Sequence, residues 1–443
     1  MLLDFTLENY GPFRDRTSLS FQATARKEHQ KNIIPCDAVK GGILSSAIVF
    51  GPNASGKSYV FKAIRSLVRM VLDAFPDGTE YPWYKPFRLN DENPRKPVSF
   101  EIRFVDDGIL YDYSISFDQR SIVSESLVYR SSRRPVTAFR RGGSDEKFNK
   151  KQQRMKEFLT SSTAFLVIGA KYNDELCAKV RNMILSLIVL ESAEIIKMAR
   201  ISCAWAADDP EKKSMLIDGL RKADLAIVDF ESTERAIDRE SIRSEIPPKY
   251  FDKMPSEIKL NDIRLMHGYE GTELKGKKIP FEMDDESTGT MSMFGIMGPL
   301  SDALINGKTL VIDEFGAYLH PILTRWLVSQ FSAENNPNRA QLIAMTHDIG
   351  LMDTDELLRR DQIFFTDKNR EDGSAELYCL SDFKGVRKEE IVLKSYMFGR
   401  YDAIPDISAR GLMDGFKNRQ VSQERDPQKN SGRYHHGRRS IRT

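Results

Sequence analysis

The chain has 443 residues, 29% of them charged, and its 66 basic residues nearly balance 64 acidic ones. A chain of this length can bury a large core and divide into two or three units. The four cysteines contain no C-x-x-C pair, which argues against a zinc site or a disulfide framework. No apolar run approaches the roughly 20 residues of a membrane span, and the N-terminus does not resemble a signal peptide, so we expect a cytoplasmic protein without a membrane partner.

The first elements predicted along the chain are strands and one long helix. Residues 2–10 and 17–22 alternate in the manner of strands and flank the turn "GPFRDR", which predicts a hairpin. The apolar segment 46–50 predicts a short buried strand, and the pattern from Gly56 to about Asp73 predicts a helix. One stripe of that helix carries Val60, Ile64, Leu67 and Val71.

The segment between this strand and helix, "GPNASGKS", fits the P-loop pattern G-x-x-x-x-G-K-[ST]. Its glycines let backbone N–H groups turn inward around a phosphate chain, and the helix adds its positive N-terminal end. We expect Lys57 to reach the β- and γ-phosphates of ATP and the Ser58 hydroxyl to hold Mg²⁺. The nucleotide-binding residues predicted here are Gly51, Pro52, Asn53, Ala54, Ser55, Gly56, Lys57 and Ser58.

The middle of the chain changes from strands to helices. Four strand-length segments between residues 99 and 141 predict an antiparallel meander. From residue 149 the pattern becomes helical, and charged helix-forming residues continue to about residue 245, so we predict a helical insertion over 149–256. Helical spacing there links Leu176, Val180, Ile184, Leu187 and Ile188. Two strand-like pieces follow, near 259–267 and 277–283.

A second anion site is predicted at "DDESTGT", where Ser287 and Gly289 open a helix. A helix N-terminus led by Ser and Gly offers N–H donors to a phosphate, although a simple N-cap would look the same.

Two further strands end in polar residues. "KTLVIDEFGAYLHP" contains an apolar strand ending in Asp313 and Glu314. We expect Asp313 to hold the Mg²⁺ shell together with Ser58, and Glu314 to polarise the attacking water. "QLIAMTHD" predicts a strand ending near His347, which could contact the γ-phosphate. Glu314, His347 and Lys57 are the predicted catalytic residues.

The order of these motifs resembles that of the ABC-type ATPases, and "ENYGPFRDR" resembles the opening of their SMC and RecF-like branch. The chain is also similar to the AAA-like ATPases of the RloA/AbiL kind, which are encoded beside phage-defence and restriction genes. The segments that carry this likeness are "ENYGPF", "GPNASGKS", "PFRL", "DDESTGT", "VIDEFGAYLHP", "THD", "LLRRDQIFF", "DFKGVRKEE" and "GRYDAIPDI".

This resemblance implies an α/β fold: an ABC-type P-loop ATPase head with a mixed sheet and an antiparallel β-subdomain. The insertion would lie between the P-loop and the signature helix. The expected domains are a first ATPase lobe (1–148), the insertion (149–256), a second lobe (257–408) and a basic, disordered tail (409–443). The chain departs from the family pattern at three places. The signature is S-T-G-T rather than the S-G-G-Q of transporters, and Asp402 stands where the family often has Gly. No Q-loop glutamine is evident, although "PFRL" could take that place.

In the ABC type, the P-loop of one subunit faces the signature helix of another across the nucleotide. The resemblance therefore implies a homodimer or higher oligomer that closes on ATP and Mg²⁺, hydrolyses it and acts as a switch. One reading is a sensor in anti-phage defence with a separate effector, such as a nuclease encoded nearby. The alternative is a RecF-like repair ATPase that binds DNA directly; a transporter subunit fits less well, and the residues after His347 leave no room for a Toprim nuclease.

The charge distribution bears on nucleic-acid binding. From Lys417 to the end there are eight Lys/Arg and two Asp/Glu, which gives this tail +6 and the rest of the chain 2 − 6 = −4. The tail could contact nucleic acid or an acidic partner, or serve only as a solubilising end.

Overall fold

The computed structural model describes residues 1–131, 134–191, 194–223, 225–243, 257–268, 276–384, 386 and 390–405. A six-stranded mixed sheet joins segments from both halves of the sequence, in the order β10 (Ile188–Glu191), β14 (Thr309–Asp313), β15 (Gln341–Met345), β5 (Ser46–Phe50), β16 (Ile363–Lys368) and β17 (Ala375–Cys379). All neighbours are parallel except β16 and β17. The ends of β5, β14 and β15, where the sequence places its functional motifs, therefore lie at one edge of the sheet.

The three central strands are buried on both faces, which explains why they are uninterrupted apolar runs. In β5, Ala47 and Val49 face one core while Ile48 and Phe50 face the other. The first core also contains α1 (Lys57–Leu72), α3 (Phe165–Lys171) and α4 (Glu175–Leu185). The second contains parts of α5 (Ile195–Ala206), α6 (Pro210–Lys222), α8 (Thr288–Asn306), α9 (Pro321–Ser329) and α10 (Val392–Met397).

A second six-stranded sheet is antiparallel throughout and has the order β2-β1-β6-β7-β8-β9. The hairpin β1 (Leu2–Glu8) and β2 (Thr17–Ser20) confirms the predicted N-terminal hairpin. The predicted meander is confirmed by β6 (Val98–Asp106), β7 (Ile109–Phe117), β8 (Ile122–Arg130) and β9 (Val136–Arg141). The pairing of β1 with β6 makes them a single sheet, a long-range contact that the sequence pattern did not predict.

The range predicted as a helical insertion, 149–256, also contains strands. Its described residues include α2 (Lys150–Met155), α3, α4, α5 and α6, but also β10 and β11 (Ile227–Asp238). Leu187 and Ile188 were placed in one helix with Ile184, and this was wrong: α4 ends at Leu185 and Ile188 begins β10. The backbone hydrogen bonds to β14 stabilise these four residues as a strand, although their apolar spacing is that of a helix. The boundary at 256 and the tail 409–443 lie outside the described residues.

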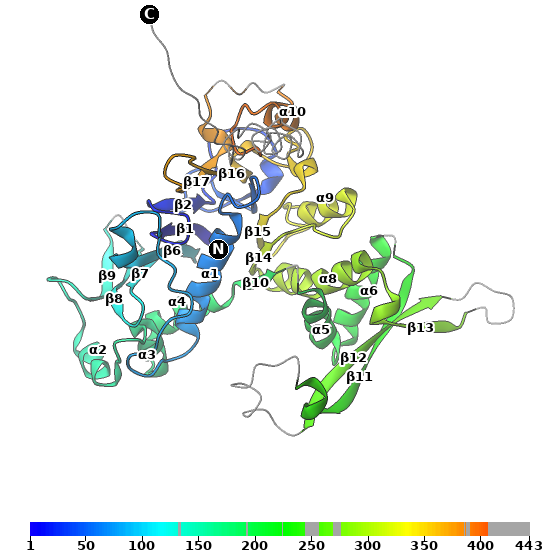
Figure 1. Cartoon of the computed structure of the whole chain (residues 1–443), viewed down its shortest axis with the longest axis horizontal. Helices are drawn as coiled ribbons and strands as arrows, with labels where there is room; N and C mark the ends of the chain where they lie inside the picture. Colours follow the sequence, from blue (N-terminus) through cyan, green and yellow to red (C-terminus); the bar gives the residue numbers. More distant parts are fainter. Residues whose placement is uncertain are drawn as a thin grey trace, which may run out of the picture. The chain divides into compact units, whose positions relative to one another are not determined.

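A three-stranded antiparallel sheet follows α6, formed by β11, β12 (Glu257–Gly268) and β13 (Lys278–Glu282). The strands β12 and β13 confirm the two strand-like pieces predicted near 259–267 and 277–283. We use the name arm for α5, α6 and β11–β13. Figure 1 shows α5 and α6 beside α8, and β11 packs on α6.

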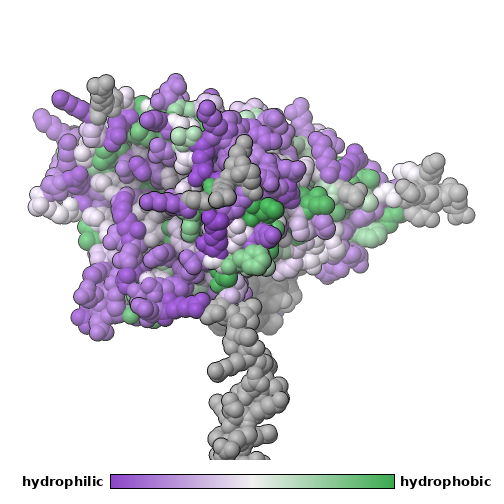
Figure 2. Space-filling view, turned by 90° about the horizontal axis from the view of Figure 1, so that it is seen from above, coloured by the Kyte–Doolittle hydropathy of each residue, from purple (hydrophilic) through white to green (hydrophobic). Residues whose placement is uncertain are grey.

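The predicted α/β fold with a mixed sheet and an antiparallel β-subdomain is thus confirmed, and the insertion between the P-loop and Ser287 is partly β-structured. Two short strands, β3 (Ile33–Ile34) and β4 (Ile43–Leu44), pair beside the main sheets. Hydrophilic residues cover most of the face shown in Figure 2. Within the described part of the chain, no helix combines the length and apolar character needed to cross a bilayer.

Candidate functional site

The segment 51–56 wraps around the N-terminus of α1 as a P-loop. Gly51 and Gly56 have φ values of 150° and 118°, which side chains disfavour. A Cβ atom on Gly51 would lie 2.4 Å from the Thr366 carbonyl oxygen on β16, so only glycine fits this close approach. The Ser55 hydroxyl is hydrogen-bonded to that of Thr366 at 2.6 Å, which holds the loop against the sheet.

Lys57 is the first residue of α1, and the residue is only 7% exposed. Its ammonium donates hydrogen bonds to the carbonyl oxygens of Gly51 and Pro52, at 2.7 and 2.9 Å. Burial lowers the pKa of Lys57 to about 8, and the nearby Asp313 and Glu314 carboxylates only partly oppose this effect. A cation held in this way is placed to pair with a phosphate oxygen once one enters the loop.

Asp313 is the last residue of β14, and Glu314 directly follows it. The Asp313 side chain is buried, and burial raises its pKa while a hydrogen bond from the Ser58 hydroxyl opposes the rise. Glu314 is exposed and has a φ of 54°, a left-handed conformation that is uncommon for a residue with a side chain. In this conformation the chain turns away from the direction of β14, and the Glu314 side chain lines the P-loop cavity.

His347 follows β15, the strand that lies between the P-loop strand and the acid strand. The preceding Thr346 is buried; its hydroxyl donates to the Phe315 carbonyl oxygen at 2.7 Å and accepts from the Asp348 N–H at 3.0 Å. These bonds fix the loop that carries His347. Desolvation and the positive charge of Lys57 lower the pKa of His347, so its imidazole is neutral at pH 7.

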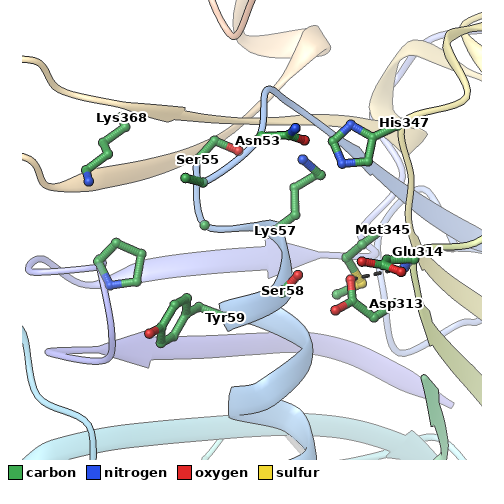
Figure 3. Close-up of a pocket in the computed structure, with 13 residues that line it drawn as sticks. Asn53, Ser55, Lys57, Ser58, Tyr59, Asp313, Glu314, Met345, His347 and Lys368 are labelled. Atoms are coloured by element: carbon green, nitrogen blue, oxygen red, sulfur yellow. Dashed lines mark hydrogen bonds between the residues drawn. The ribbon is translucent and has the colours of Figure 1, made fainter. Parts of the chain in front are cut away.

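These groups line one cavity of about 600 Å³ (Figure 3). The predicted residues that line it are Asn53, Ala54, Ser55, Gly56, Lys57, Ser58, Asp313, Glu314 and His347. Gly51 and Pro52 lie behind them and contact Lys57 through their carbonyl groups. The structure therefore brings together three motifs that span 290 residues of the sequence from Lys57 to His347 (347 − 57).

The cavity also contains Pro12, Tyr59, Met345 and Lys368, which the sequence reasoning missed. Pro12 belongs to "ENYGPF", a segment noted for its resemblance but not for a contact with the site. The Ala375 N–H donates to the Pro12 carbonyl oxygen at 2.8 Å, so the β16–β17 hairpin holds this loop in place. Lys368 could have been suspected only from its position at the end of a strand.

Ser287 and Gly289 lie elsewhere and do not line this cavity. Ser287 is the N-cap of α8: its exposed hydroxyl accepts a hydrogen bond from the Thr290 N–H at 3.0 Å. A Cβ atom on Gly289 would come within 2.9 Å of the Tyr318 carbonyl oxygen, so the loop after the acids packs directly on the start of α8. "PFRL" is not part of the cavity either; the Phe87 N–H donates to the Asn9 side chain.

The residues present fit a nucleotide with Mg²⁺. The Ser58 hydroxyl and the Asp313 carboxylate lie together beside the P-loop, and both are hard oxygen donors. Within the described ranges no group of three or more His, Cys, Asp or Glu residues could hold a metal alone. Mg²⁺ is usually held in nucleotide sites by one or two protein oxygens together with phosphates and waters.

The comparison with protein families gives one match. The family described as "AAA domain, putative AbiEii toxin, Type IV TA system" matches residues 46–170 and 202–353, which include the P-loop, the start of α8, both acids and His347. No curated protein matches the chain.

Two solved structures of SMC head domains are similar over most of the chain. The SMC head bound to the C-winged helix domain of ScpA has 12% sequence identity and a TM-score of 0.43, and the similarity covers 85% of this chain and 97% of that one. The SMC head domain from Thermotoga maritima has 13% identity and a TM-score of 0.39, with coverage of 85% and 98%.

Proposed function

The chain belongs to the family described as "AAA domain, putative AbiEii toxin, Type IV TA system", and on this premise we propose that it binds ATP with Mg²⁺ and hydrolyses it. The observation that carries the proposal is the cavity in which Lys57, Asp313 and Glu314 meet. Lys57 begins α1, the two acids stand together at the end of β14, and each has the chemistry that phosphoryl transfer to water requires.

The roles of the residues follow from their positions. Lys57 would exchange its bonds to the loop carbonyls for bonds to the β- and γ-phosphates. Ser58 and Asp313 would hold Mg²⁺, which neutralises phosphate charge when bound. Glu314 would accept a proton from the water that attacks the γ-phosphorus, as the bond to the β-phosphate oxygen breaks. His347, neutral at pH 7, would donate a hydrogen bond to the γ-phosphate.

We further propose that two chains share each nucleotide. Ser287 offers a helix N-terminus to an anion, yet it does not line the P-loop cavity of its own chain. Tyr318, whose carbonyl oxygen packs against Gly289, is 54% exposed, and Ile322, four residues later, is 68% exposed. A second chain that placed its P-loop cavity over Ser287 would cover them. The two chains would form a dimer that closes on ATP and opens after hydrolysis.

The likeness to the RloA/AbiL kind and the toxin–antitoxin wording of the family description support a switch in phage defence. In this function a separate effector protein would respond to whether the dimer is closed on ATP or open. The RecF-like alternative predicts direct DNA binding. The net charge of −4 before Lys417 does not favour the binding of a polyanion such as DNA.

The test is ATP turnover by the purified chain, with and without duplex DNA. We expect Mg²⁺-dependent turnover that DNA does not change and an ATP-dependent increase in molecular mass by light scattering. A Glu314→Gln variant, which should retain ATP, would trap the closed dimer for capture of the effector. Absence of turnover would contradict the proposal, and strong stimulation by DNA alone would favour the repair function.

A further inference from the structure

Helix α8, which begins at the signature residues, contains a proline in its interior, Pro299. Proline has no backbone N–H, so the carbonyl oxygen of Gly295, four residues earlier, loses its donor within the helix. A buried carbonyl without a donor is costly, and another group has to replace the missing one.

That group is Ser202 of α5, whose side chain is fully buried. Its hydroxyl donates to the Gly295 carbonyl oxygen at 2.7 Å and accepts from the Gly298 N–H at 3.0 Å. One hydroxyl of the arm thus replaces the backbone bond that Pro299 removes from α8.

The two helices can approach this closely because both contact positions on α8 are glycines. A Cβ atom on Gly298 would lie 2.5 Å from the Ser202 Cα, and one on Gly295 would lie 2.8 Å from the Met198 Cβ. Because close-packed helices with no free space move together, α8 has to follow α5. Since α6 packs on both helices and β11 packs on α6, the arm and α8 behave as one body.

A second contact joins the arm to the very start of α8. His267 on β12 is hydrogen-bonded through Nε2 to the Glu286 carboxylate at 2.7 Å. The Glu286 side chain is only 6% exposed, and this residue directly precedes Ser287. The arm therefore contacts the residue just before the N-cap of α8 and contacts the helix again in the turn that leads to its proline.

We propose that Ser202 is a positioning residue for hydrolysis: it fixes the signature residues of α8 to the arm, so that the position of the arm sets whether Ser287 and Gly289 can reach the nucleotide of a second chain. This inference rests on the proposed function. A protein that binds the arm would then control turnover without touching the nucleotide.

The experiment compares Ser202→Ala, Pro299→Ala and the double variant. Ser202→Ala leaves the Gly295 carbonyl without its donor and removes both hydrogen bonds that join α5 to α8 at this point. We expect kcat to fall about tenfold or more with KM and single-chain ATP binding unchanged, since a displacement of about 1 Å can cost that much. In the double variant the new N–H of residue 299 restores the bond to Gly295 within α8, but the hydrogen bonds from Ser202 of the arm are still missing, so the melting temperature should recover while kcat stays low.

The control is Ser292→Ala, the same change on α8. The Ser292 hydroxyl is buried and has no hydrogen-bond partner among the described residues, so its loss should leave kcat unchanged. Wild-type kcat in Ser202→Ala would overturn the inference. So would a parallel loss of kcat, ATP binding and melting temperature, or wild-type kcat in the double variant, which would show that Ser202 serves only to satisfy the Gly295 carbonyl. An inactive wild type would instead refute the proposed function.

Discussion

The Lys57 ammonium lies 2.7 Å from the carbonyl oxygen of Gly51, so the P-loop lysine is bonded to its own loop. ATP must replace these bonds with phosphate oxygens. In a Lys57→Ala variant this exchange cannot occur, and ATP binding should be lost. At a concentration of one hundred times Kd, ATP with Mg²⁺ should stabilise the wild type by about 2.7 kcal/mol and the variant by almost nothing. Thermal unfolding measures this, with Arg69→Ala, an exposed cation on the same helix, as the control; equal shifts in Lys57→Ala and wild type would contradict the P-loop role.

The same lysine predicts how binding depends on pH. Its pKa is about 8 in the empty site, and a bound triphosphate favours the protonated form and so raises the pKa. Below pH 8 the lysine is already charged; above pH 8, binding must take up a proton. The affinity for a non-hydrolysable ATP analogue should therefore be flat from pH 7 to 8 and then fall by up to about tenfold per pH unit.

Equilibrium binding between pH 7 and 9.5 measures this dependence. Proton uptake above pH 8 can be checked by calorimetry in two buffers with different ionisation enthalpies. Lys57→Arg, which stays charged throughout this range, is the matched control and should give a flat profile. A flat profile in the wild type as well would show that Lys57 does not titrate in this window.

The two acids should give different kinetic defects. Glu314→Gln should retain nucleotide and Mg²⁺ but lose about 10²- to 10⁴-fold in kcat, as expected when a general base is removed. Asp313→Asn should instead weaken ATP binding that depends on Mg²⁺. Steady-state turnover and binding with and without Mg²⁺ separate these effects, and Glu334→Gln, an exposed acid in a loop, serves as the control. Wild-type turnover in Glu314→Gln would rule out its role as the base.

The backbone at Glu314 gives a prediction about stability. Its φ of 54° costs about 1 kcal/mol for a residue with a side chain. Glu314→Gly should relieve this strain. Glycine is also more flexible in the unfolded chain, which offsets part of the gain, so the free energy of unfolding should rise by about 0.5 kcal/mol while turnover is lost. Glu314→Ala removes the same carboxylate but keeps the strain, and it should show no such gain. Urea unfolding of the two variants makes the comparison, and equal stabilities would mean that the conformation is not strained.

The sequence predicted the parts of the site that are encoded locally. Gly51 to Ser58 form a phosphate loop because glycines, lysine and helix start are consecutive, and Asp313 follows an uninterrupted apolar strand. Pro12 and Lys368 were missed because their place in the cavity depends on the β16–β17 hairpin reaching the N-terminal loop. The strand β10 was missed because its four residues continue an apolar helical spacing. The hydrogen bonds of Ser202 with Gly295 and Gly298 also join residues that are 93 and 96 positions apart.

Ser287 allows the shared site to be tested with two inactive chains. Ser287→Arg places a bulky cation at the start of α8, where a second chain has to approach. Because Ser287 does not line the cavity of its own chain, single-chain ATP binding should be nearly intact, while closure and hydrolysis are lost. Lys57→Ala is inactive for the opposite reason, since its signature helix is normal and its P-loop is not.

Mixing the two variants should restore activity. In a mixed dimer one site combines both lesions, whereas the other combines the wild-type P-loop of the Ser287→Arg chain with the wild-type signature of the Lys57→Ala chain. ATP turnover should therefore appear on mixing and rise with the fraction of mixed dimers, although each variant alone stays inactive. Mixing Ser287→Arg with Ser287→Arg/Lys57→Ala is the control and should give none, because neither chain supplies an intact signature helix. Full turnover by dilute wild-type chain that light scattering shows to be monomeric would refute the shared site, because Ser287 would then not be needed from a second chain.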